Sequence, residues 1–191
     1  MDVLGARSHN EAVVYVLVRD CRACGSRNRD VTDESGRRDG ATVVEYTAFC
    51  RECTTIETYA FRLPESDPQT GVTAVVFGGD ESSTIIDAGE WLAFADRTAG
   101  GGPVEPAGLT PEERADAALA LQSAAAAVRE VVKFIRPGED RVSVSALWTE
   151  RGRAVYDRDP WRMSRSRMAA VETAYREAAE RLADGNPIWS P

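Results

Sequence analysis

The four cysteines of the chain occur as two pairs, and they are the residues whose types and spacing best suit a chemical role. Two residues separate Cys21 from Cys24, and two separate Cys50 from Cys53. Two thiolates at this spacing on a tight turn can bind one ion, and a second turn of the same kind completes a tetrahedral ligand set. The spacing therefore predicts a metal site at these cysteines, with Zn2+ as the expected ion.

Other uses of the cysteines are disulfide formation, redox chemistry and iron binding. Disulfides need an oxidising compartment, and a redox Cys-x-x-Cys pair would leave the second pair without a role. Iron remains an alternative to zinc, because both ions accept four thiolates. Four sulfur ligands fill a tetrahedron and leave no position for water or substrate, so we interpret the metal as structural.

The segments next to the cysteines have the composition of strands. Residues 11–19 are rich in valine, and residues 42–49 and 54–62 are rich in β-branched and aromatic residues. Between the two cysteine pairs, residues 28–40 contain mainly polar and turn-forming residues, which predicts an exposed loop. The predicted order is strand, cysteine turn, strand, cysteine turn and strand.

This order resembles a zinc ribbon over residues 11–63. The resemblance depends on Cys21, Cys24, Gly25, Cys50 and Cys53. It implies a small antiparallel sheet held together by zinc, as in many proteins of transcription and translation and in adaptors. The chain departs from the usual pattern at Arg22 and Arg51, which stand where proline often follows the first cysteine of a pair. Because such ribbons occur in unrelated proteins, the resemblance implies a fold and not a function.

The remainder of the chain is predicted to be mainly helical. Residues 64–71 form a turn-rich connector, which we take as the boundary between a zinc-ribbon-like β module, residues 1–63, and a second part, residues 64–191. After the connector, residues 72–77 predict one more strand. The expected fold class is α+β, with a small antiparallel β module followed by an α-rich part.

Helix-start signals place the helices of the second part. Asp87 and Glu90 have the spacing of a capping box, and Thr110-Pro-Glu-Glu113 combines a capping box with proline at the first helical position. The second signal begins a long helix that ends before Pro137. We also expect a shorter helix over 146–156, with Leu147 and Trp148 inward, and a final helix over 162–183.

Charge and hydropathy limit the function classes. The 191 residues carry a formal net charge of −8. Most of the excess acid falls in residues 64–110, which contain one arginine and eight acidic residues. Such a charge opposes binding to polyanions. We see no secretory or membrane-spanning segment, so we expect a cytoplasmic protein, in a reducing compartment that keeps the thiols available for metal.

Catalytic motifs are scarce. The chain has one histidine, His9, and it has no P-loop and no dinucleotide-binding glycine pattern. Adjacent acids such as Asp80 with Glu81 and Asp157 with Asp159 are typical of solvated turns. We therefore expect a binding protein, with a redox or hydrolytic enzyme as a minor alternative.

Residues 151–167 form a second candidate site, referred to below as the arginine cluster. It contains six arginines, together with Tyr156 and Trp161. Cations and aromatic rings in this arrangement suit a nucleic-acid surface, but a solvated pair of helices has the same composition. Our first hypothesis is a protein-binding adaptor, regulator or toxin-neutralising inhibitor. The alternative is a nucleic-acid-binding ribbon protein that uses this cluster with Arg22, Arg27 and Arg29.

Overall fold

The computed structural model describes residues 2–66, 75–100 and 108–184. The chain divides into two compact units, Met1–Ile85 and Ile86–Pro191, which we call the cysteine unit and the helical unit. Strands occur in the first unit and most of the helices in the second, which confirms the α+β class. Most of the predicted connector lies outside the described residues, as does the start of the predicted strand at 72–77. The described end of that segment is not a strand.

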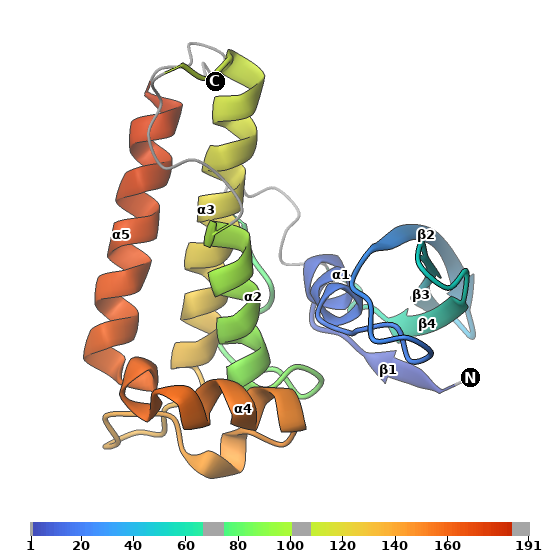
Figure 1. Ribbon diagram of the computed structural model, residues 1–191. Coiled ribbons are helices and arrows are strands. Elements are labelled where there is room, and N and C mark those ends of the chain that lie inside the picture. The colour runs from blue at the N-terminus through green and yellow to red at the C-terminus, as the bar shows by residue number, and fades with distance from the viewer. Residues whose placement is uncertain (1, 67–74, 101–107, 185–191) are drawn as a thin grey trace. The chain divides into compact units, whose positions relative to one another are not determined.

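The cysteine unit contains one four-stranded sheet and one helix (Figure 1). Its elements are β1 (Val3–Gly5), α1 (His9–Leu17), β2 (Arg29–Arg38), β3 (Ala41–Cys50) and β4 (Ile56–Arg62). The strand order is β1-β4-β3-β2. Strands β2, β3 and β4 are antiparallel neighbours, and β1 pairs with β4 in parallel. The sheet is therefore mixed, because β1 adds a parallel strand to the predicted antiparallel ones.

Helix α1 packs against one face of this sheet. The residues that form the shared core are Ala6, Ala12, Val16, Val44, Tyr46, Ala48, Tyr59 and Phe61. Along β3 the core residues alternate with residues of the opposite face, as the period of a strand requires. One face of the sheet is thus buried under α1. On the other face, Thr47, Phe49, Ile56 and Thr58 are exposed, whereas Val43 and Ala60 are buried.

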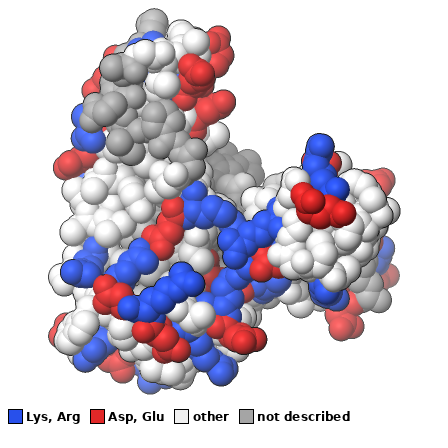
Figure 2. Space-filling model, viewed as in Figure 1, with Lys and Arg blue, Asp and Glu red and all other residues white. Residues whose placement is uncertain are grey.

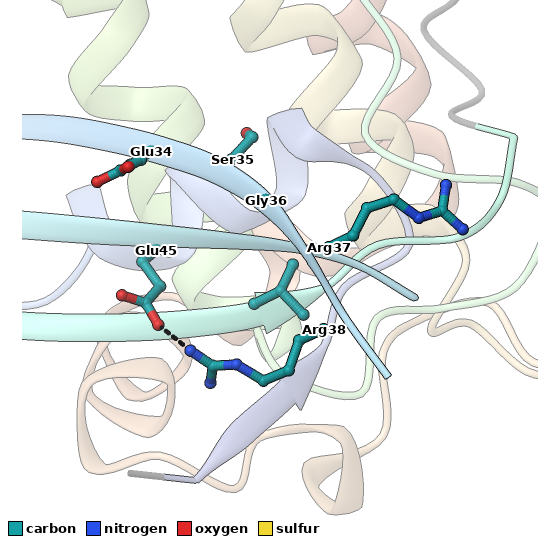
Figure 3. Close-up of a pocket in the computed structure, with 7 residues that line it drawn as sticks. Glu34, Ser35, Gly36, Arg37, Arg38 and Glu45 are labelled. Carbon is teal, nitrogen blue, oxygen red and sulfur yellow. Dashed lines mark hydrogen bonds and ion pairs between the residues drawn. The ribbon is translucent and has the colours of Figure 1, made fainter. Parts of the chain in front are cut away.

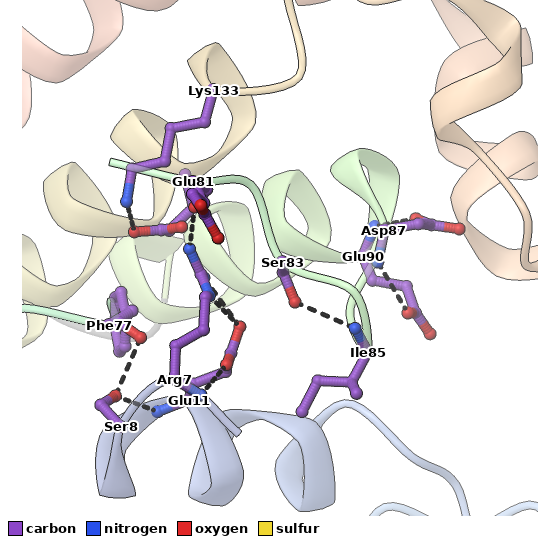
Figure 4. Close-up of polar contacts among 11 residues, drawn as sticks. Arg7, Ser8, Glu11, Phe77, Glu81, Ser83, Ile85, Asp87, Glu90 and Lys133 are labelled. Carbon is purple, nitrogen blue, oxygen red and sulfur yellow. Dashed lines mark hydrogen bonds and ion pairs between the residues drawn. The ribbon is translucent and has the colours of Figure 1, made fainter. Parts of the chain in front are cut away.

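The prediction of a strand over residues 11–19 is wrong, because this segment forms α1. Ser8 caps the helix by accepting a hydrogen bond from Glu11 N at 3.0 Å, and Ser8 Oγ donates to Phe77 O at 2.8 Å. Glu11 is buried, and its carboxylate pairs with Arg7 Nη2 at 2.7 Å (Figure 4). Valine favours strands only weakly, so the cap and the burial of the helix against a sheet outweigh its preference.

The prediction of a loop over residues 28–40 is also wrong, because most of this segment is β2. This strand pairs with β3 over its whole length, from Arg29 opposite Cys50 to Arg38 opposite Ala41. The turn consists of Asp39 and Gly40 with φ angles of 52° and 79°, the left-handed conformations that a two-residue hairpin needs. The polar composition reflects exposure, since nearly all of β2 is solvent-accessible.

The helical unit is built around α3 (Pro111–Val132), which contacts both α2 (Ala88–Gly100) and α5 (Arg165–Ala183). One cluster in its core consists of Ala117, Ala118, Leu121, Ala178, Ala179 and Leu182. The small alanine side chains allow these helices to approach closely. Within the described ranges, no helix combines the length and the apolar composition needed to cross a bilayer.

The remaining elements connect α3 to α5. They are the 3-10 turn η1 (Val144–Ala146), α4 (Glu150–Arg158) and the 3-10 turn η2 (Pro160–Met163). The predicted short helix begins later than expected, at Glu150, and ends where Pro160 was expected to stop it. Leu147 is buried as predicted, whereas Trp148 is exposed.

The buried carboxylate of Asp87 holds two helix starts together. It accepts a hydrogen bond from Glu90 N at 2.9 Å, which caps α2, and Glu90 in turn accepts from Asp87 N (Figure 4). The same carboxylate accepts from Thr149 N at 2.8 Å and from Thr149 Oγ1 at 2.6 Å. Thr149 caps α4 by accepting from Gly152 N at 2.9 Å. Asp87 therefore joins the N-termini of α2 and α4.

Two glycines make this close approach of α2 and α4 possible. A Cβ atom on Gly89 would lie 2.3 Å from the carbonyl oxygen of Gly152, and a Cβ on Gly152 would lie 2.1 Å from Asp87 Oδ1. Neither contact is sterically possible, so any side chain at these positions would separate the two helices.

We predict that Asp87→Ala lowers the free energy of unfolding of the helical unit by about 3 kcal/mol, because it leaves several buried donors without a charged acceptor. Thr110→Ala removes an exposed capping box and should cost only about 1 kcal/mol. Urea titration followed by tryptophan fluorescence measures both, since all four tryptophans belong to residues 86–191. Equal effects of the two substitutions would contradict the role assigned to Asp87.

Candidate metal centre

The sulfur atoms of Cys21, Cys24, Cys50 and Cys53 all lie within 4.8 Å of one another. The Sγ atoms of Cys21 and Cys53 are 3.5 Å apart, and those of Cys24 and Cys50 are 3.6 Å apart. A tetrahedron with metal–sulfur bonds of about 2.3 Å places its sulfurs about 3.8 Å from each other. The four cysteines thus come together, as their spacing predicts, in an arrangement that can hold one metal ion.

The two cysteine turns have the same backbone geometry. Cys21 O accepts from Gly25 N at 2.8 Å, and Cys21 N donates to Ser26 O at 2.9 Å. In the second turn, Cys50 O accepts from Thr54 N at 2.9 Å, and Cys50 N donates to Thr55 O at 2.9 Å. Each turn is therefore closed by its own backbone, which directs both of its sulfurs to the same side.

The fourth residue after each first cysteine is in the left-handed region. Gly25 has a φ of 73° and Thr54 has a φ of 58°. Glycine adopts this conformation without strain, whereas it costs a β-branched residue about 1–2 kcal/mol. Thr54 adopts this conformation within the turn that carries Cys50 and Cys53.

The four thiols differ in burial and in proton affinity. Cys21 and Cys50 are buried, Cys53 is half-buried and Cys24 is exposed. The hydroxyl and the backbone N–H of Thr55, with help from Cys24, lower the pKa of Cys53 to about 6. At Cys24 the backbone N–H of Ser26 favours the thiolate, but the sulfur of Cys53, partial desolvation by the neighbouring turn and the sulfurs of Cys50 and Cys21 outweigh it and raise the pKa to about 12.

Arginines surround the cysteines, and each is paired with a carboxylate. Glu57 lies 3.3 Å from Arg22 Nε and 2.8 Å from Arg29 Nη1. The other pairs are Arg27 with Asp20 at 2.8 Å and Arg51 with Asp30 at 2.8 Å. Arg22 and Arg51 therefore neutralise carboxylates near the site. The three arginines that the nucleic-acid hypothesis needs in this unit, Arg22, Arg27 and Arg29, are all ion-paired.

The arginine cluster is part of the helical unit and is partly neutralised within it. Arg162 Nη2 lies 2.5 Å from Asp96 Oδ1, an ion pair that raises the pKa of the guanidinium, and Arg167 Nη1 lies 3.4 Å from Asp159 Oδ2. Within the described residues, Arg158 and Arg165 make no ion pair. Figure 2 shows basic and acidic side chains interspersed at the end of the helical unit where α4 lies.

The single histidine, His9, takes part in the core of the cysteine unit. The hydroxyl of Tyr46 lies 3.1 Å from His9 Nε2, and the two rings are 5.8 Å apart between centroids. The Tyr46 hydroxyl thus gives the half-buried imidazole at the start of α1 a hydrogen-bond partner.

An exposed apolar pair next to the cysteines was not foreseen from the sequence. Phe49 precedes Cys50, Ile56 begins β4, and the two residues are directly opposite each other in the sheet. Their side chains lie on the face away from α1, since the neighbouring Ala48 belongs to the core. Phe49 is 38 % exposed and Ile56 is 64 % exposed. Alternation along the strands was a possible signal, but the register was needed to place them side by side.

Comparisons of the chain with protein-family models, with curated proteins and with solved structures gave no match.

We predict that purified protein carries one metal ion per chain and that Cys50→Ser lowers metal affinity by at least about 100-fold, because a structural site needs all four of its ligands. Cys24→Ser should lower it less, since water can reach the exposed fourth position and replace the sulfur. Elemental analysis and the sulfur-to-Co2+ charge-transfer absorption of the cobalt-loaded protein measure these effects. A fully folded monomer that binds neither ion would contradict the prediction.

Proposed function

We propose that this chain is a non-enzymatic, structural-zinc protein that acts by binding a protein partner, as an adaptor, a regulator or a toxin-neutralising inhibitor. The observation that carries the proposal is the exposed pair of Phe49 and Ile56 beside the four-cysteine cluster. In this proposal, zinc keeps the ends of β3 and β4 in register, and the register presents the apolar pair to the partner.

The donor set supports zinc in a reducing, cytoplasmic environment. All four cysteines are free thiols, and their sulfurs are 3.5 Å apart or more, much farther than the roughly 2.05 Å of a disulfide. A compartment that keeps thiols reduced suits this state. Four sulfurs in a tetrahedron suit zinc, and iron is the ion that the metal analysis must distinguish from it.

The composition of the outer sheet face supports a protein partner. The next positions along β3 and β4, Thr47 and Thr58, are opposite each other, uncharged and exposed, while Asp30 of β2, paired with Arg51, lies opposite Phe49. They extend the apolar pair into an uncharged strip on a chain in which 28 % of the residues are charged. Exposed apolar patches with polar margins are typical of protein-binding surfaces. An uncharged strip gives little attraction to the phosphates of a nucleic acid.

Binding of the partner is expected to depend on the apolar pair. Replacing Phe49 and Ile56 together by threonine preserves strand propensity and the cysteine turns but removes the apolar contact. A partner protein is first identified by its capture from native lysate with the wild type. We predict that the double variant captures at least about 10-fold less of this partner, as expected when hot-spot side chains are truncated. Quantitative mass spectrometry of the captured proteins, followed by calorimetry with the purified partner, makes the measurement.

Val144→Thr is the matched control, because Val144 is 59 % exposed but belongs to the helical unit. The control should retain the partner. Equal recovery of the partner with the wild type, the double variant and the control would show that the apolar pair does not bind the partner.

Nucleic-acid binding is a second candidate because of one arrangement in the helical unit. Trp161 is 64 % exposed, and the guanidinium of Arg141 lies 4.7 Å from the centre of its ring. An exposed indole can stack on a base while cations of the same segment contact phosphate; here Arg158 and Arg165 form no ion pair with any described residue. The net charge of −8 opposes the approach of a polyanion, so we rank this candidate second.

We predict that single-stranded and duplex nucleic acids of random sequence bind no more tightly than about 10–100 μM near physiological salt. Fluorescence anisotropy over a salt series measures this, with a control in which Arg158 and Arg165 are changed to glutamate. Submicromolar affinity that falls steeply with salt and disappears in the control would make nucleic-acid binding the leading function.

A further inference from the structure

The outer edge of β2 is a long strand edge without a neighbour. Strand β2 is the last strand of the sheet, and no other described strand pairs with its outer side. It has ten residues, and from Thr32 to Arg38 every residue is exposed. Strand edges of this length are templates for pairing with another chain unless their side chains prevent it.

The hairpin determines which backbone groups of β2 point outward. A two-residue turn makes its flanking residues, Arg38 and Ala41, a hydrogen-bonded pair, and pair types alternate along antiparallel strands. Asn28 O accepts from Arg51 N at 2.9 Å at the other end of the ladder, as this alternation requires. Even-numbered residues of β2 therefore bond to β3. Asp33, Ser35 and Arg37 direct their N–H and C=O groups to the open edge.

The charges along this edge are self-complementary. Acidic residues precede Ser35, and basic residues follow Gly36, in the run Asp33-Glu-Ser-Gly-Arg-Arg38. If two copies of β2 pair in an antiparallel manner with Ser35 opposite Ser35, Asp33 of each copy lies directly opposite Arg37 of the other. Opposite charges at such positions stabilise a strand pair, and like charges destabilise it.

The acidic and basic groups concerned are available for this pairing. In the described residues, neither Asp33 nor Glu34 makes an ion pair. Among the described residues, the Arg37 side chain makes one hydrogen bond, of 2.6 Å, to Gly40 O within its own turn. An edge with charges of one sign would repel a second copy, whereas this edge attracts one.

A hollow beside the edge provides space for a side chain of the second copy. It has a volume of about 210 Å3 and is lined by residues 34–38 together with Val43 and Glu45 (Figure 3). Gly36 contributes no side chain to it, and a Cβ there would meet no atom within 4 Å. In the pairing centred on Ser35, Glu34 of the second copy lies opposite Gly36. The hollow leaves room for this glutamate.

We propose that the chain forms a homodimer by antiparallel pairing of β2 with β2 of a second copy, centred on Ser35, which joins two sheets into one continuous sheet. This contact uses a strand edge and charged side chains, and it is separate from the apolar pair on the sheet face. The dimer and the proposed function can therefore fail independently.

Charge reversal tests the pairing. Asp33→Arg and Arg37→Asp each place like charges at both facing positions and should raise the dimer dissociation constant about 10-fold or more. An equimolar mixture of the two variants restores both attractive pairs and should associate as tightly as the wild type. Sedimentation velocity over an about 100-fold range of concentration of the metal-loaded chain measures these constants.

Two further variants separate pairing from general effects of charge. Asp116→Arg makes the same change of charge on an exposed position of α3 and should leave the dimer unchanged. Ser35→Pro removes an outward N–H group without removing a bond to β3 and should abolish the dimer. A wild type that stays monomeric, or a dimer that tolerates both Asp33→Arg and Ser35→Pro while the fold is intact, would overturn the proposal.

Discussion

The convergence of four sulfurs within 4.8 Å is the constraint on which the cysteine unit depends. It joins the segment after α1 to the point where the chain passes from β3 to β4, because Cys50 is the last residue of β3. The apolar core under α1 is small, and in sheets of this size the free energy of metal binding becomes free energy of folding. The strained backbone of Thr54 is tolerated in this context. The metal would also hold Phe49 and Ile56 opposite each other, which connects the site to the proposed binding surface.

In the described part of the helical unit, segments are held together by hydrogen bonds to one buried carboxylate. The carboxylate of Asp87 is fully buried. It accepts hydrogen bonds from Glu90 N at the start of α2 and from the N–H and hydroxyl groups of Thr149. Charge-assisted hydrogen bonds of this kind are among the stronger polar contacts in proteins. Because Gly89 and Gly152 allow the backbones to approach, the bonds reach normal lengths. The long helices then bury alanines and leucines on their facing sides.

The charges of the chain are arranged in local pairs more than in fields of one sign. Arginines near the cysteines are matched by Asp20, Asp30 and Glu57, and two members of the arginine cluster are matched by Asp96 and Asp159. Such pairs add little stability at a surface, but they reduce the positive charge that nucleic-acid binding would use. In the described part of the cysteine unit, the exposed features include an apolar pair on a sheet face and a strand edge with charges of both signs.

The sequence by itself determined the features that depend on neighbours along the chain. The Cys-x-x-Cys spacings, the capping boxes at Asp87 and Thr110 and the stop at Pro160 act within a single turn, so their residue types suffice to predict them. The valines of α1 and the polar residues of β2 could not be assigned in this way, because a segment becomes helix or strand according to the surface it packs on and the strand it pairs with. The tertiary structure alone decided those two elements, the register that places Phe49 beside Ile56, and the open edge of β2. Each requires contacts between residues that are distant in the chain.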